Sequence, residues 1–152
     1  MCTVRGVSAN AAIGWRCDAR SAVTLGNRSL QAPVARTFLE SALGSTLPSF
    51  TSEWAALRRT YPPTSPPTDA DFLAALRAHV LRLLGEGRVA ETTRFFYALE
   101  RLLEEADPIL HELIARDLVA ALATECRLAA IDARRVEPYL GTRTRAAWVN
   151  TA

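Results

Sequence analysis

Residues 103–114 read LEEADPILHELI, and this stretch decides the predicted fold. Asp107 is of a type preferred as a helix N-cap, and Pro108 suits the first helical position because the N–H that proline lacks would have no partner there. The residue before a proline is also biased away from helical geometry. The dipeptide therefore predicts that one helix ends near Ala106 and that another begins at once.

Three amphipathic helices are predicted around this boundary. The first begins after Thr68, whose hydroxyl can cap it, and ends at Gly85 and Gly87. The second covers about 88–106 and the third about 108–127. Apolar residues recur at helical spacing in each helix: Phe72, Leu76, Val80, Leu83 and Leu84; then Val89, Phe96, Leu99, Leu102 and Leu103, flanked by Phe95 and Tyr97; then Leu110, Leu113, Ile114, Leu118, Ala121 and Leu122, flanked by Ile109 and Val119.

The short connections predict that these helices pack as antiparallel neighbours, each covering an apolar stripe that a single helix would expose. No segment shows the alternation of a strand. The sequence therefore predicts an all-α fold, either an antiparallel helical bundle or a stack of helix pairs resembling HEAT repeats. Tyr139, Leu140 and Trp148 are expected to cover the end of the bundle.

The rest of the chain divides into three parts. Residues 1–32 lack periodicity and are predicted to be a disordered leader, either an arginine-rich transit segment or the product of a start assigned upstream of one such as Val34. Residues 33–61 predict two short helices with Phe38, Leu39, Trp54, Leu57 and Tyr61 as their apolar positions. Residues 62–67, PPTSPP, predict a stiff linker to the helical core domain at 68–149.

Charge is unevenly distributed along the chain. The net charge is +2, all eighteen cationic residues are arginine, and residues 1–36 carry five of them against one acid. From Glu86 to Glu112 there are seven acids against three arginines, whereas Arg127 to Ala152 holds five arginines against two acids. This polarity gives no indication of nucleic-acid binding, and it suggests that the acidic end of the helical hairpin docks a basic protein.

Five acidic residues form the predicted partner-binding surface: Glu100, Glu104, Glu105, Asp107 and Glu112. The spacing of the first three fits a hydrated helix face better than a catalytic carboxylate pair. Asp117 falls close to the apolar stripe of the third helix, and an ion pair near Arg116 or an exposed groove would each explain it.

Reactive side chains form no recognisable catalytic motif. Cysteines at positions 2, 17 and 126 have neither metal-binding nor redox spacing, which favours a reducing cytosol and a core position for Cys126. His79 and His111 are expected at helix surfaces or at the boundary of the apolar faces. With Asp117 or Cys126 they are the set that a metal-dependent hydrolase would use. We expect no cofactor, and no stretch approaches the roughly 20 apolar residues of a membrane span.

A family resemblance rests on three segments. These are 95–107, FFYALERLLEEAD; 111–115, HELIA; and the tail with Leu140-Gly141, Arg145 and Trp148. Together they resemble a family of small all-helical bacterial proteins that has no assigned catalytic activity and is similar in style to the immunity proteins of polymorphic toxins. The resemblance covers about 69–148 and implies a binder of a protein such as a toxin. Asp117 and Ala120 depart from the small residue and acid expected there.

The tail motif Leu-Gly-x-x-x-Arg-x-x-Trp also has a structural interpretation. Gly141 is expected to end a helical turn in the left-handed conformation, and Arg145 to reach a helix C-terminus or a carboxylate. Trp148 is expected to bury its ring against the bundle. These roles predict that the motif stabilises the fold.

The sequence thus predicts a cytosolic, non-enzymatic protein-binding domain, immunity-like or regulatory. The alternatives are a scaffolding helical module without a dedicated toxin partner and, more remotely, the metal-dependent hydrolase. The identity of the partner and the oligomeric state are left open.

Overall fold

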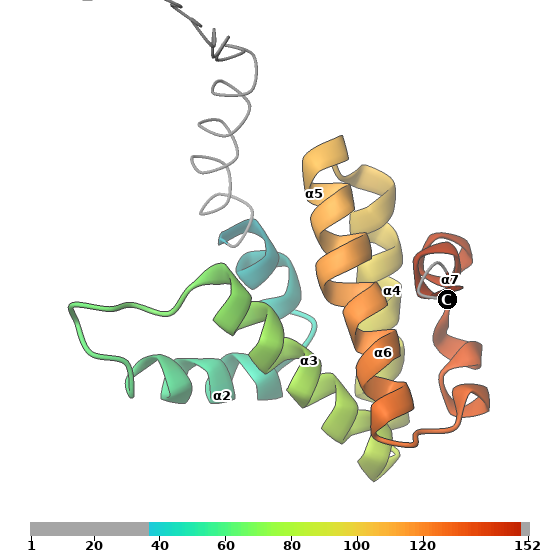
Figure 1. Cartoon of the computed structure of the whole chain (residues 1–152), viewed down its shortest axis with the longest axis horizontal. Helices are drawn as coiled ribbons and strands as arrows, with labels where there is room; N and C mark the ends of the chain where they lie inside the picture. Colours follow the sequence, from blue (N-terminus) through green and yellow to red (C-terminus); the bar gives the residue numbers. More distant parts are fainter. Residues whose placement is uncertain (1–36, 150–152) are drawn as a thin grey trace, which may run out of the picture.

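The computed structural model describes residues 37–149, and every regular element in this range is helical (Figure 1). The all-α prediction is confirmed, while the predicted leader at 1–32 lies outside the described residues. Residues 37–44 are helical. The elements that follow are α2 (Pro48–Arg58), α3 (Asp69–Glu86), α4 (Val89–Glu105), α5 (Pro108–Glu112), the π-helix η1 (Leu113–Ala120), α6 (Ala121–Leu128), the 3₁₀ turns η2 (Ala133–Arg135) and η3 (Glu137–Tyr139), and α7 (Thr142–Val149).

Both ends of α3 follow the predicted signals. The Thr68 hydroxyl accepts a hydrogen bond from the Asp71 N–H at 3.3 Å, and the Asp71 carboxylate accepts one from the Thr68 N–H at 2.7 Å. This reciprocal capping box satisfies amide groups that a helix start leaves without partners. At the other end Gly87 has φ 69°, the left-handed conformation that glycine adopts without steric cost.

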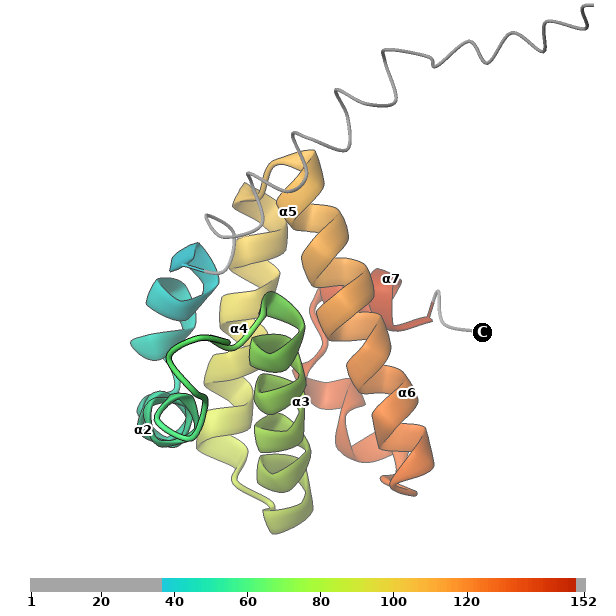
Figure 2. The same cartoon turned by 60° about the vertical axis from the view of Figure 1, so that its left-hand side comes forward.

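The boundary at Asp107-Pro108 is also confirmed. One carboxylate oxygen of Asp107 accepts hydrogen bonds from the N–H groups of Ile109 and Leu110, both at 2.9 Å. From this corner α5, η1 and α6 run on as one rod beside α4, and α3 packs against both (Figure 2). The three predicted core helices are therefore neighbours, as expected.

The core joins these helices to the segments before them. Leu39, Leu43 and Leu47 recur every fourth residue and are buried, and the Trp54 ring packs edge-on against Phe72 of α3 at 5.2 Å. The remaining fully buried large side chains come mostly from α3, α4 and η1, and they include Leu76, Leu83, Phe95, Phe96, Leu99, Leu103, Ile114 and Leu118.

Some predicted core positions are exposed. Tyr97 is 69% exposed because it lies outside the arc of α4 that Phe95, Phe96 and Leu99 define. Val89 is in phase with that arc but is 59% exposed, since it is the first residue of the helix. Ile109 and Phe38 are also about half exposed, at 49% and 47%.

The third predicted helix is not a regular α-helix. Its central eight residues, Leu113–Ala120, are π-helical, and the Ala121 N–H bonds to the carbonyl of Arg116, five residues back. Arg77 of α3 supports this wide turn, because its Nη1 donates to the Asp117 carbonyl at 2.8 Å while its Nε donates to Glu125 at 2.7 Å. The Asp117 carboxylate pairs with Arg116 at 2.7 Å, which explains an acid beside the apolar stripe.

The C-terminal segment covers one side of the bundle, where α7 packs on α4 and η1 (Figure 2). Val136 and Leu140 are buried, and the rings of Tyr139 and Trp148 meet Phe96 at centroid distances of 6.1 and 6.3 Å. Tyr139, Leu140 and Trp148 were predicted to cover the end of the bundle. They cover the bundle, but along its side.

Candidate functional site

The corner between α4 and α5 projects from the molecule in both views and carries four of the five predicted binding residues (Figures 1 and 2). Glu104, Glu105, Asp107 and Glu112 are all exposed. We call these four residues, together with Ile109, the acidic corner. Within residues 37–149, Glu104 has no hydrogen bond or ion pair, so its carboxylate is the least committed of the four.

The other acids of the corner have local partners. Arg101 donates to Glu105 at 2.5 Å, and Arg116 donates to Glu112 at 3.3 Å. Both are exposed pairs four residues apart on a helix, so each contributes only about 0.3–0.5 kcal/mol. A partner can therefore displace either pair at little cost. Asp107 differs because it caps α5, which ties its carboxylate to the fold.

The fifth predicted residue, Glu100, is half-buried and covered by α7, so the prediction that it lies on an open, hydrated helix face is wrong. Its carboxylate accepts hydrogen bonds from the N–H groups of Arg143 and Thr144 at 2.9 and 3.0 Å, and from the Thr144 hydroxyl at 3.0 Å. Burial acts to raise the pKa of Glu100, but these hydrogen bonds outweigh it and hold that pKa below its ordinary value. Glu100 caps α7 from a different helix.

Gly141 has a role that the sequence did not predict. Within the described part of the chain Gly87 is the only glycine with positive φ, so the expected left-handed conformation of Gly141 is wrong. A Cβ atom at Gly141 would lie 2.5 Å from Cδ and from Oε2 of Glu100. Glycine is needed there because the carboxylate of Glu100 passes directly over the backbone.

The other motif residues fulfil their structural predictions. Arg145 Nη2 donates to the carbonyl groups of Glu137 and Leu140 at 3.3 and 3.4 Å, at the end of η3. The Trp148 ring is half-buried against Phe96. The tail motif therefore holds α7 on the bundle.

A cluster of polar side chains joins α2, α3 and α4, and sequence reasoning missed it. His79 is 1% exposed, which corrects its predicted place at a helix surface or at the boundary of an apolar face. Its Nε2 lies 3.1 Å from Ser49 Oγ, and its Nδ1 lies 2.7 Å from Glu53 Oε2. Ser49 donates to Glu91 at 2.6 Å, and Arg82 donates to Glu53 at 2.5 Å. The hydrogen bonds that join different helices link residues 26 to 42 positions apart, so no local pattern marks the cluster.

The order Ser49, His79, Glu53 resembles a nucleophile, base and orienting acid, but the hydrogen bonds run the wrong way. The single hydroxyl proton of Ser49 points to Glu91, so the Ser49 oxygen accepts from His79 Nε2–H. A histidine that already carries a proton on Nε2 cannot remove one from the serine. These hydrogen bonds fit a structural link between α2, α3 and α4 better than general-base catalysis.

The predicted metal ligands are not assembled. Among the described residues, no three His, Cys, Asp or Glu side chains are placed to hold one metal ion. Cys126 is 2% exposed, and burial, followed by the charge of Glu125, raises its pKa to about 11. Its thiol is therefore a core group with little nucleophilic character. No helix between residues 37 and 149 is long and apolar enough to span a membrane.

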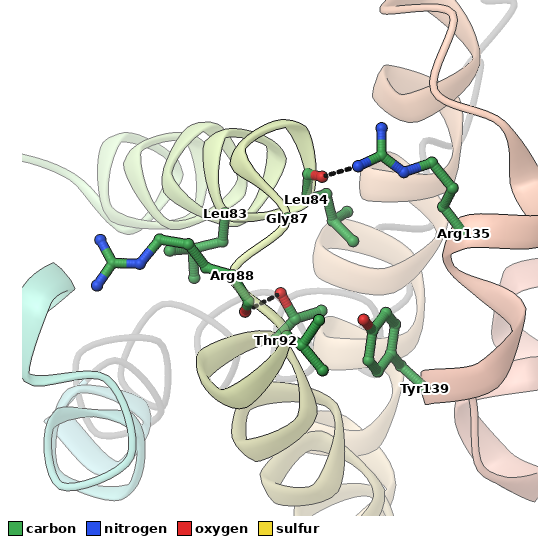
Figure 3. Close-up of a pocket in the computed structure, with 8 residues that line it drawn as sticks. Leu83, Leu84, Gly87, Arg88, Thr92, Arg135 and Tyr139 are labelled. Carbon is green, nitrogen blue, oxygen red and sulfur yellow. Dashed lines mark hydrogen bonds between the residues drawn. The ribbon is translucent and has the colours of Figure 1, made fainter.

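Two open pockets accompany these features. One, of about 360 Å³, lies between the first described helix and α2, with Phe50, Trp54 and Phe72 in its wall. The other, of about 210 Å³, lies where the ends of α3 and α4 meet η2 and η3 (Figure 3).

Comparison with known proteins gives one match. A family model described as a domain of unknown function, DUF7674, matches residues 40–152. This range contains the acidic corner, the polar cluster and the tail motif. Neither the curated proteins nor the solved structures contain a match.

Proposed function

We propose that this chain, which belongs to the DUF7674 family, is a non-catalytic protein-binding domain that contacts a basic surface of its partner through the acidic corner. The observation that carries the proposal is the composition of that corner. Four exposed carboxylates lie within five residues of Ile109, which is 49% exposed, at a part of the molecule that projects from the bundle. A projecting corner of this kind can reach into a concave partner surface.

The two kinds of side chain would contribute differently. Exposed charges mostly speed the encounter and select the sign of the partner, while buried apolar and aromatic anchors supply most of the affinity. Ile109 at the corner and Tyr97, 69% exposed on α4, are available as anchors. The predicted partner surface is therefore basic at its rim and apolar where it meets Ile109.

The polar cluster supports the non-catalytic assignment. Ser49 and His79 have the residue types of a hydrolytic site, but the Ser49 proton is donated to Glu91 and His79 is almost fully buried. The same residues are well placed to hold α2 against α3 and α4, which is a structural role.

Within this proposal, the specific role is that of an immunity-like or regulatory protein acting in the cytosol. The support is the family resemblance of the helical hairpin and the tail, together with the charge of the corner. An immunity protein must occlude a toxin, and many toxin surfaces that act on nucleic acids are basic for the reasons that govern phosphate binding. A basic toxin is therefore the partner class we propose.

The test uses the full chain and the product of an adjacent gene that encodes a toxin-like protein. Affinity is measured by titration calorimetry for the native chain, for Glu104→Arg and for Ile109→Ala. Glu104→Arg is suitable because Glu104 has no partner in the described structure, whereas a change at Asp107 would also remove a helix cap. The matched control is Glu137→Arg, a reversal at an exposed residue far from the corner.

We expect Glu104→Arg to weaken binding about tenfold or more, with a loss that shrinks at high salt, and Glu137→Arg to leave it within about twofold. Equal effects of the two reversals would refute the acidic corner as the binding surface. Failure of every adjacent product to co-purify, together with no protection against toxicity on co-expression, would refute the immunity role.

A further inference from the structure

The pocket in Figure 3 lies where two parts of the chain that are distant in sequence meet, residues 83–92 and the turns η2 and η3. Leu84 comes from the last turn of α3, Gly87 from the turn, Val89 and Thr92 from the first turns of α4, and Arg135 and Tyr139 from η2 and η3. Its volume of about 210 Å³ lies below the roughly 300–1,000 Å³ of typical small-molecule pockets. A nucleotide is too large for this space, and a single short side chain or small organic acid fits it.

One cation faces the pocket without an acidic partner. Arg135 Nη2 donates to the Leu84 carbonyl at 3.1 Å, which fixes the guanidinium at the rim. Within residues 37–149 this is the only hydrogen bond of the Arg135 side chain, so its other N–H groups remain available. The nearby Arg88 points away from the pocket in Figure 3 and pairs with Glu86 and Glu91. These two acids are therefore neutralised by Arg88 and not by Arg135.

A second polar group reaches the same space. The Tyr139 hydroxyl points into the pocket toward Thr92 (Figure 3). The Tyr139 ring stacks on Phe96, with their centroids 6.1 Å apart. This hydroxyl has no hydrogen bond within the described structure. Thr92 is 1% exposed and gives its proton to the Arg88 carbonyl at 3.0 Å, so its oxygen can only accept from a ligand.

We propose that this pocket binds a carboxylate group attached to a short branched aliphatic body. The guanidinium of Arg135 and the hydroxyl of Tyr139 both donate, as a carboxylate requires, and planar guanidinium groups match carboxylates particularly well. Leu84 and Val89 supply an apolar wall for the aliphatic part; Val89 is 59% exposed without a ligand. The pocket is separate from the acidic corner and does not depend on the proposed function.

A carboxylate on a branched aliphatic body can belong to a free branched-chain acid or to the C-terminal residue of a peptide. The test titrates the ¹⁵N-labelled full chain with isovalerate, with N-acetyl-leucine and with N-acetyl-leucinamide, and follows the backbone amides of Gly87, Val89 and Thr92. The variants are Arg135→Gln and Tyr139→Phe. The matched control is Arg134→Gln, which changes the neighbouring arginine that does not line the pocket.

We expect at least one of the two acids to shift these three amides, and the amide analogue to bind about tenfold more weakly or not at all. Arg135→Gln and Tyr139→Phe should each reduce affinity, and Arg134→Gln should not. Tyr139→Phe keeps the ring that packs on Phe96, so it tests the hydroxyl even if the arginine variant proves less stable. Binding of isovalerate alone identifies a free acid, and binding of N-acetyl-leucine alone identifies a chain end. No shift with either acid, or equal affinity for the amide, overturns the proposal.

Discussion

The contact between Glu100 and Gly141 can be tested by a double-mutant cycle. Glu100→Ala removes the acceptor for the first amides of α7, and Gly141→Ala introduces a Cβ atom 2.5 Å from the same carboxylate. The methyl group can be accommodated only if the Glu100 side chain swings away. Both substitutions should therefore break the same hydrogen bonds by different routes.

The magnitude follows from the groups left without partners. Thr144 is 0% exposed, so its N–H would lose its acceptor in a buried position, at a cost of about 1–3 kcal/mol. The Arg143 N–H is exposed and can bond to water, and the Thr144 hydroxyl keeps the Gly141 carbonyl at 3.2 Å. Each single variant should therefore lower the free energy of unfolding by about 2 kcal/mol.

The assay is urea unfolding followed by circular dichroism for the native chain, both single variants and the double variant. Because the hydrogen bonds can be lost only once, the double variant should be about 2 kcal/mol less stable than the native chain, not about 4. Gly85→Ala is the control, since a Cβ there meets nothing within 4 Å and should be neutral or slightly stabilising. Additive losses would show that the two residues act independently and would refute the proposed contact.

Four further substitutions test other parts of the fold. Gly87→Ala should destabilise the protein by about 1–2 kcal/mol in urea unfolding, because φ at Gly87 is 69°. Ala130, which follows α6, also has a left-handed backbone, with φ 54°, so Ala130→Gly should stabilise by about 0.5 kcal/mol. Changes of the opposite sign would contradict the left-handed conformation at these two positions. Asp107→Ala should lower the free energy of unfolding by about 1 kcal/mol, and no change in thermal melting would count against the cap. The hydrogen bond from Arg82 lowers the pKa of Glu53 to about 2; burial opposes this shift, and the hydrogen bond from His79 adds to it. The ionised Glu53 carboxylate therefore stabilises the fold fully above about pH 4.5, and this stabilisation is lost as the pH falls toward 2. Because the pair is exposed, the contribution should be below about 1 kcal/mol, and Arg82→Gln should flatten unfolding free energy against pH in that window.

Local signals in the sequence predicted the helix boundaries well. Thr68 with Asp71, and Asp107 with Pro108, act within a single turn of chain, so residue type and spacing are enough to specify them. Apolar periodicity likewise identified the central stripes of the three helices. It was wrong at Val89, the first residue of α4, because apolar periodicity does not show how far the packed face extends toward the end of a helix.

Contacts between distant segments could not be predicted in this way. Glu100 appears on a polar face of its helix, and only the position of α7 shows that the face is covered. The polar cluster around His79 takes one or two residues from each of three helices, none with a distinctive local pattern. Of the predicted binding residues, Glu104, Glu105, Asp107 and Glu112 lie together at the acidic corner. Glu100 lies apart from them, in the contact between α4 and α7. Whether the gathered four bind a partner remains a prediction.

The π-helical stretch at 113–120 constrains how the length of this chain can vary. A π-turn holds one residue more than an α-turn, so rewinding this stretch to a regular α-helix at unchanged length would add the rotation of about one residue to the rod. Everything beyond would then rotate by about 100° about the rod axis, since an α-helix has 3.6 residues per turn. Glu125 would swing out of reach of Arg77, and the surface on which α7 rests would turn aside. We therefore expect relatives with the same C-terminal helix either to keep this π-helical winding or to be one residue shorter in this stretch.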